Sequence, residues 1–323
     1  MEEFKRLLEK VDKLKPSTIK NYVARLSFVE KTLGMPIDEI HLDDVKEITS
    51  TLESTGASNE SMRAYITAII KYLRLLHGNA ETLDEYMKFH KTLSMTVKDI
   101  NMKNELSEKE EKSYIPFEEM KQKFIEWYDL NKEKPDFNWN DALFIGNFLL
   151  LKAPVRLGNW RNMKVVYIDK TNMREKLKQL DDTFNYLLVV SHKNMFEFIY
   201  VFNDYKTSAF LGDINVVVED PRLKEMVMKV ALVINDGDFI NNIQQSVQSN
   251  KFKRIAKRIF GVEFSVDAVR HSFISDMYDN KRVSAAERKE ILTLFGHVYQ
   301  PSTTDLYYRK TKNDKKIDLN TKE

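Results

Sequence analysis

The sequence predicts a mainly α-helical protein with one small antiparallel β-sheet, an α+β fold. Long stretches carry apolar residues at intervals of three and four, the spacing of a helix face that is buried in a core. Three short segments of the second half, NYLLVVS, MFEFIYVFN and DINVVVE, are rich in the β-branched and aromatic residues that favour strands. With 323 residues, the chain is long enough for two domains that each bury a core.

The first domain is predicted as a compact helical unit over residues 17–100, preceded by an N-terminal arm at residues 1–16. Its longest apolar pattern begins after a helix-start signal at Ser58 or Asn59. We expect the apolar stripe of this helix to lie in the core because its members recur on one helical face. The stripe consists of Met62, Tyr65, Ile66, Ile69, Ile70, Leu73 and Leu76.

A polar stretch of mixed charge separates the two halves and predicts a linker at residues 101–116. Pro116 ends this stretch, and a helix is expected to begin near Phe117. The second domain is then predicted over residues 117–310. The remaining residues, 311–323, form a polar C-terminal tail.

In the second domain, an apolar stretch from Trp139 predicts a buried helix that stops at Pro154. Arg156 follows directly, so a rigid element would hold its side chain. The three strand segments are expected to form a meander, with Lys206 and Thr207 in the turn region after its second strand.

Composition excludes several classes of protein. The chain has no cysteine, so it contains no disulfide, cysteine zinc site or thiol nucleophile, and this usage favours a reducing compartment. No apolar run approaches the length that spans a bilayer, which predicts a soluble protein without a membrane partner. The formal net charge is only +2, so there is no domain-wide basic excess of the kind that indicates nucleic-acid binding.

One local cluster of cations does suggest contact with nucleic acid. Five basic residues share a predicted helical segment and have no acid nearby in the sequence. Two interpretations stay open: the face is solvated, or it contacts phosphates and releases counterions from DNA. The cluster consists of Lys251, Lys253, Arg254, Lys257 and Arg258.

Four short segments of the second half occur in a characteristic order: APVRLGNW, DYKT, SVDAVRHSF and LFGHVYQPSTTDLYY. Arg-His-Ser, a capped helix, Leu-Phe-Gly-His, a loop and Ser-Thr-Thr-x-x-Tyr are hard to obtain from core packing. With these motifs the chain resembles the tyrosine recombinase (phage-type integrase) family. The resemblance suggests a protein of a virus or other mobile element. It implies a helical N-terminal domain that clasps DNA and a catalytic domain at residues 117–310.

The resemblance also implies a reaction and a role for each residue. Reversible cleavage of a phosphodiester without metal or ATP needs a nucleophile that stores the energy of the broken bond in a covalent ester. A tyrosine phenol can form such an ester. Two guanidiniums suit the charge that develops on the phosphate oxygens, and an ammonium can protonate the leaving 5′ oxygen. The implied catalytic residues are Arg156, Lys206, Arg270, His297 and Tyr307. No cofactor or metal is expected.

Two departures from the family pattern leave alternatives open. The family usually carries histidine or lysine three residues before its second arginine, where this chain has Asp267. An ionised aspartate cannot donate a hydrogen bond to a phosphate, so Asp267 either orients Arg270 or weakens the site. The loop after His297 is also one residue longer than usual, which makes Tyr308 a rival to Tyr307 as the nucleophile.

Two interpretations of the whole chain therefore stand. In the first, it is an active site-specific recombinase or integrase that acts on double-stranded DNA through a 3′-phosphotyrosyl intermediate, in a synapse of four protomers. In the second, it is a catalytically impaired relative that binds DNA as an architectural or regulatory factor. Strand relaxation of the type IB topoisomerase kind shares the chemistry without needing a synapse. Each interpretation implies a protein inside the cell, wherever the DNA is.

Overall fold

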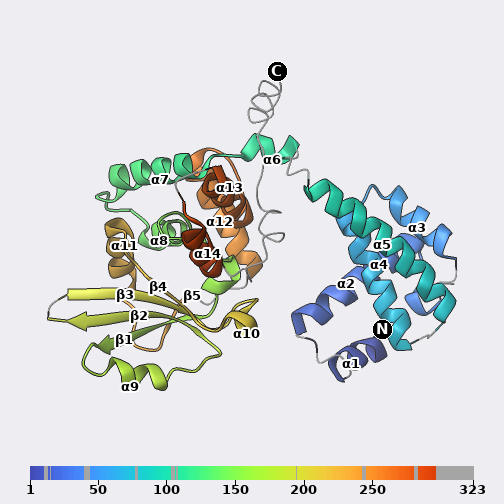
Figure 1. Cartoon of the computed structure of the whole chain (residues 1–323), viewed down its shortest axis with the longest axis horizontal. Coiled ribbons are helices and arrows are strands. Elements are labelled where there is room, and N and C mark those ends of the chain that lie inside the picture. The colour runs from blue at the N-terminus through green and yellow to red at the C-terminus, as the bar shows by residue number, and fades with distance from the viewer. Residues whose placement is uncertain are drawn as a thin grey trace. The chain divides into compact units, whose positions relative to one another are not determined.

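The computed structural model describes residues 1–10, 14, 16–39, 44–76, 79–102, 106, 108–193, 195–241, 245–279 and 283–295. The chain divides into two compact units, Met1–Lys103 and Asn104–Glu323 (Figure 1). It is mainly helical with one small sheet, so the predicted fold class is confirmed. None of the described helices is long and apolar enough to cross a membrane.

The described part of the first unit is helical. Its elements are α1 (Glu2–Lys10), α2 (Pro16–Leu33), η1 (Ile37–Glu39), α3 (Val45–Ser54), α4 (Asn59–Leu76) and α5 (Ala80–Met102). Helix α4 begins where the sequence predicts, because the Ser58 hydroxyl accepts a hydrogen bond from the Ser61 amide at 3.2 Å. Most of its apolar stripe is buried, with Tyr65 and Leu76 packed at the edge of the core.

The stretch predicted as an N-terminal arm contributes to the core of this unit. Helix α1 buries Phe4 and Leu8 completely, and the Phe4 ring packs 5.4 Å from that of Tyr72 on α4. Residues 2–10 therefore form part of the packed unit, because two large apolar side chains on one helical face must leave water.

The second unit combines helices with a sheet. Its helices are α6 (Glu108–Ser113), α7 (Phe117–Asn131), α8 (Trp139–Leu149), α9 (Met173–Lys178), α10 (Ser208–Leu211), α11 (Pro221–Ala231), α12 (Gln245–Phe260), α13 (Val266–Asp279) and α14 (Ala285–Leu294), with the short turn η2 (Leu157–Trp160). The stretch 101–116 predicted as a linker includes α6, and Ile115 belongs to the core of this unit. Helix α7 begins at Phe117, as predicted.

The described strands form a five-stranded sheet in the order β4-β3-β2-β1-β5. They are β1 (Met163–Asp169), β2 (Asn185–His192), β3 (Met195–Phe202), β4 (Ile214–Val217) and β5 (Phe239–Asn241). Strands β2, β3 and β4 form the predicted antiparallel meander. The sheet as a whole is mixed, however, because β1 pairs with β2 in parallel. The connection through α9 is long enough for such a crossover, which a tight hairpin cannot make.

Both faces of the sheet are covered (Figure 1). Alternate residues of β2 and β3, including Leu187, Val189 and Tyr200, face the main core with α7, α8, α11 and α12. Their neighbours, including Leu188 and Val190, face a smaller cluster that α9 covers with Met173. Because successive side chains of β2 face opposite sides of the sheet and both sides are buried, its sequence is a continuous apolar run.

Helix α8 lies in the centre of the main core. All its residues from Asp141 to Leu149 are buried, and a Cβ added at Gly146 would lie 3.0 Å from the Met226 sulfur on α11. The helix ends at Leu149, earlier than the predicted stop at Pro154. Proline restricts only the residue before it, here Ala153, and the chain leaves the helix earlier, while Leu150 and Leu151 are still buried.

Candidate active site

The turn that carries Arg156 stands on a rigid aromatic base. Arg156 is half-buried and extended, and its carbonyl accepts a hydrogen bond from the Asn159 amide at 3.0 Å, which opens η2. The last residue of η2, Trp160, packs edge-on against Phe148 at 5.8 Å and against Tyr200 at 4.9 Å between ring centroids. The core therefore limits the movement of the turn.

Lys206 lies in the turn between β3 and α10, as predicted, and is exposed. The preceding residue, Tyr205, is buried, and its hydroxyl donates to the Gly212 carbonyl at 2.6 Å. Gly212 has a positive φ of 68°, which a glycine adopts without strain. This bond closes the loop around α10, so Lys206 projects from an anchored turn.

One buried amide joins the Arg156 turn to the Lys206 turn. The Asn185 Nδ2 donates to the Asn159 carbonyl at 2.8 Å and to the Asp204 carbonyl at 3.0 Å. Its Oδ1 accepts from the amides of Asn203 at 2.8 Å and Asp204 at 2.9 Å. Asn185 is 2% exposed at the start of β2, and the four bonds satisfy its amide. No sequence pattern predicts a role for Asn185, whose only signal is that it is an asparagine directly before the apolar run of β2.

Arg270 is buried on α13 with an exposure of 1%. Its Nη2 donates to the Phe295 carbonyl at 3.1 Å, and its guanidinium carbon lies 4.0 Å from the centroid of the Phe295 ring. Its Nη1 lies 3.6 Å from the Asp267 carboxylate. A buried guanidinium is costly unless such partners compensate for lost water, so these contacts hold the side chain in one orientation.

Asp267 lies one helical turn before Arg270, in the first turn of α13, with a side chain that is 75% exposed. An ion pair with so exposed an acid stabilises little, while a carboxylate in a first turn is favoured by the helix dipole. The structure thus has the Asp267 carboxylate beside the Arg270 guanidinium, and both interpretations of Asp267 stay open.

Helix α13 is fixed from two sides. The Ser272 hydroxyl donates to the Ile115 carbonyl at 2.7 Å, and the Asp276 carboxylate accepts from the Glu118 amide at 3.1 Å. On the other side, Ala153 packs in one apolar cluster with Ile274 of α13 and with Phe295. The segments that carry Arg156 and Arg270 are therefore neighbours in the fold.

The basic cluster on α12 divides into paired and unpaired cations. Asp141, which is buried on α8, lies 3.2 Å from Lys251 and 2.9 Å from Arg258. Lys257 lies 3.5 Å from Glu263. The cations are therefore not all without acids, because α8 supplies Asp141 from a distant part of the sequence and Glu263 lies just after α12. Lys253 and Arg254 are exposed and pair with no acid among the described residues.

The remaining predicted catalytic residues, His297, Tyr307 and Tyr308, lie outside the described residues, which end at Phe295. The preceding helix, α14, begins as predicted with a cap: the Ser284 hydroxyl accepts from the Glu287 amide at 3.2 Å.

Comparison with known proteins gives a likeness in structure only. Neither a protein-family model nor a curated protein matches the chain by sequence. The structure of the XerH site-specific recombinase bound to its palindromic difH substrate, a post-cleavage complex, is similar with a TM-score of 0.51 and 13% identity. The match covers 99% of this chain and 83% of that one.

Two further solved structures match less well. The Tn1549 transposon integrase in complex with circular intermediate DNA has a TM-score of 0.49 and 14% identity, with 98% of this chain and 97% of that chain covered. A lambda integrase dimer bound to a core site has a TM-score of 0.45 and 14% identity, with 97% and 98% covered. We base the fold on the match to XerH: the chain has the fold of a tyrosine recombinase, as its motifs predict.

Proposed function

We propose that the chain is a site-specific DNA recombinase or integrase that cleaves and rejoins strands through a 3′-phosphotyrosyl intermediate. The observation that carries this proposal is the Asn185 amide, which joins the turns of Arg156 and Lys206. These turns hold the proposed phosphate clamp and the proposed acid. A shared rigid anchor is what a preorganised site requires.

The proposed reaction assigns one task to each residue. The Tyr307 oxygen attacks the scissile phosphorus, forms the phosphotyrosyl ester and loses its proton with help from His297. The bond from phosphorus to the 5′ oxygen breaks, and Lys206 gives that oxygen a proton. Arg156 and Arg270 stabilise the negative charge on the non-bridging oxygens. Attack by the freed 5′ hydroxyl on the ester reverses the sequence and rejoins a strand.

The proposed partner is double-stranded DNA, gripped at its phosphates. On α12, Lys253 and Arg254 are the residues best suited to this contact because they are exposed and lack a competing acid among the described residues. Lys251 and Arg258 already share the Asp141 carboxylate, so they contribute less free charge. The XerH structure is bound to a DNA substrate, and we propose that this chain also acts on DNA. From the family resemblance we propose a synapse of four protomers, working inside a cell.

A second candidate function has its own observation. Arg270 is 1% exposed and stacks on Phe295, so a phosphate could reach its guanidinium only if these groups rearranged. Together with Asp267 in place of a donor, this burial favours a DNA-binding relative that does not cleave.

A covalent-adduct assay separates the two candidates. The full chain is incubated with nicked suicide duplexes of its target, without metal, and the adduct is mapped by peptide analysis. Recombinase chemistry predicts an adduct on Tyr307 that Tyr307→Phe abolishes and Tyr308→Phe retains, since phenylalanine removes only the hydroxyl. An adduct on Tyr308 would move the nucleophile by one residue. No adduct from a duplex that the protein demonstrably binds would favour the non-cleaving relative.

A further inference from the structure

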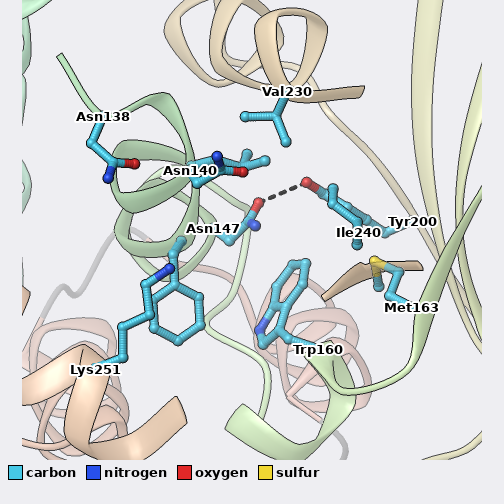
Figure 2. A pocket seen from close by; sticks show the side chains of 11 residues that line it. Asn138, Asn140, Asn147, Trp160, Met163, Tyr200, Val230, Ile240 and Lys251 are labelled. Atoms are coloured by element: carbon cyan, nitrogen blue, oxygen red, sulfur yellow. Dashed lines mark hydrogen bonds between the residues drawn. The ribbon is translucent and has the colours of Figure 1, made fainter. Parts of the chain in front are cut away.

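A cavity of about 380 Å³ lies in the second unit, lined from α8, α11, α12, η2 and the sheet (Figure 2). The proposed DNA chemistry does not use it. Its apolar wall includes Leu143, Phe144, Val230 and Ile240. This volume is in the range of small-molecule sites in proteins, which combine an apolar wall with a few directed polar groups.

Two side chains of the lining have hydrogen-bonding capacity to spare. Trp160 is 4% exposed, and its indole Nε1 is buried and has no hydrogen-bond partner among the described residues. A buried donor without a partner is rare in folded proteins. The nitrogen has almost no accessible area, so Trp160 lines the cavity with the carbon atoms of its ring.

Asn147 supplies the second group. Its Oδ1 accepts from the Tyr200 hydroxyl at 2.8 Å, as Figure 2 shows. Burial raises the pKa of the Tyr200 phenol, so that phenol keeps its proton and stays the donor. This bond turns the Asn147 amide group so that its Nδ2 is left as a donor.

The charge at the cavity is positive. The Lys251 ammonium lines it, 5.5 Å from the centroid of the Phe144 ring and 3.2 Å from the Asp141 carboxylate. Asp141 is shared with Arg258, so one carboxylate faces two cations. An ammonium has three donors, which leaves Lys251 able to bind a second acceptor.

We propose that this cavity binds a small organic anion with a ring body and a carboxylate. The carboxylate accepts from the Asn147 Nδ2 and pairs with Lys251, while the ring lies against Phe144, Leu143 and Ile240. The free donors of the lining favour a ligand that accepts hydrogen bonds. Lys251 and Arg258 share one carboxylate, so the excess positive charge favours an anion. The apolar wall favours a ring.

Nuclear magnetic resonance of the full chain with ¹⁵N-labelled tryptophan tests the proposal directly. The chain has three tryptophans, so the indole region contains three signals. The probe is naphthalene-2-carboxylate, and naphthalene-2-methanol is the matched neutral ring. We expect the carboxylate to shift the Trp160 signal in a saturable way and to leave Trp127 unchanged, with at least tenfold weaker binding of the alcohol. No saturable shift at Trp160, or equal binding of both probes, overturns the proposal.

Variants then identify the groups that recognise the carboxylate. Lys251→Met keeps an unbranched side chain but removes the charge, so affinity for the carboxylate should fall about tenfold while affinity for the alcohol stays constant. Lys224→Met, at an exposed lysine of α11, is the matched control and should change neither. All affinities are measured by calorimetry on protein whose thermal unfolding remains cooperative. If Lys251→Met and Lys224→Met bind the carboxylate alike, the site is not the one proposed.

Discussion

The buried amide of Asn185 gives the sharpest test of how this fold builds its candidate site. Asn185→Ala removes four hydrogen bonds and leaves the carbonyls of Asn159 and Asp204 without that donor. At a net ~0.5–1.5 kcal/mol for each bond, the loss is roughly 2–6 kcal/mol. We expect a value in the lower half of this range, about 3 kcal/mol, because loop backbone can relax towards water. For a unit of this size, that value lowers the unfolding temperature by about 6–12 °C.

Two measurements follow from this perturbation. Thermal unfolding reports the loss of stability, with Asn215→Ala as the control because Asn215 is exposed on β4 and should change little. Single-turnover cleavage, measured well below the unfolding temperature of the variant, reports the position of the Lys206 turn. We expect cleavage of an ordinary duplex to fall by about 10²-fold, the effect of a small misplacement in an active site.

A comparison of two substrates tests whether Asn185 acts through Lys206. A duplex with sulfur in place of the leaving 5′ oxygen needs little protonation, so it should be cleaved by Asn185→Ala with a smaller loss than the oxygen duplex. If the variant cleaves both duplexes with the same loss, Asn185 does not position the proposed acid. If the stability is unchanged as well, the hydrogen-bond reasoning itself is refuted.

Three further predictions concern DNA contact, pH dependence and domain organisation. Replacing Lys253 and Arg254 by alanine should lower the slope of log K against log[salt] by about two units, against no change for Lys224→Ala; an unchanged slope would assign the pair to a solvated face. Burial raises the pKa of the Asp276 carboxyl above its usual 3.8, so its protonated form suits the fold and its contribution to stability is lost as pH rises. The thermal stability of Asp276→Asn relative to the wild type should therefore increase from pH 3 to pH 7. A stability difference that stays constant over this range would contradict the direction of the pKa shift. Limited proteolysis should cut first within 101–116, and first cuts within 140–300 would refute the proposed domain boundary.

Local signals in the sequence predicted the starts of the helices correctly. The helices at Asn59 and Phe117 begin where a capping residue and a proline indicate, because such signals act on amides only two or three residues away. The meander was predictable for a similar reason, since successive short strands pair with their nearest neighbours in the chain. The order of the four motifs indicated the fold that the likeness to XerH supports.

Only the tertiary structure decided which distant groups meet. Asp141 neutralises part of the α12 cluster from another helix, Asn185 joins two turns, and β1 pairs with β2 in parallel after a crossover. None of these contacts has a signal at short range, because a buried polar group can be satisfied by any backbone or side chain that the fold brings near. The sequence by itself determined the elements and the chemical groups on offer. Packing decided which of these groups are paired, buried or held in place for function.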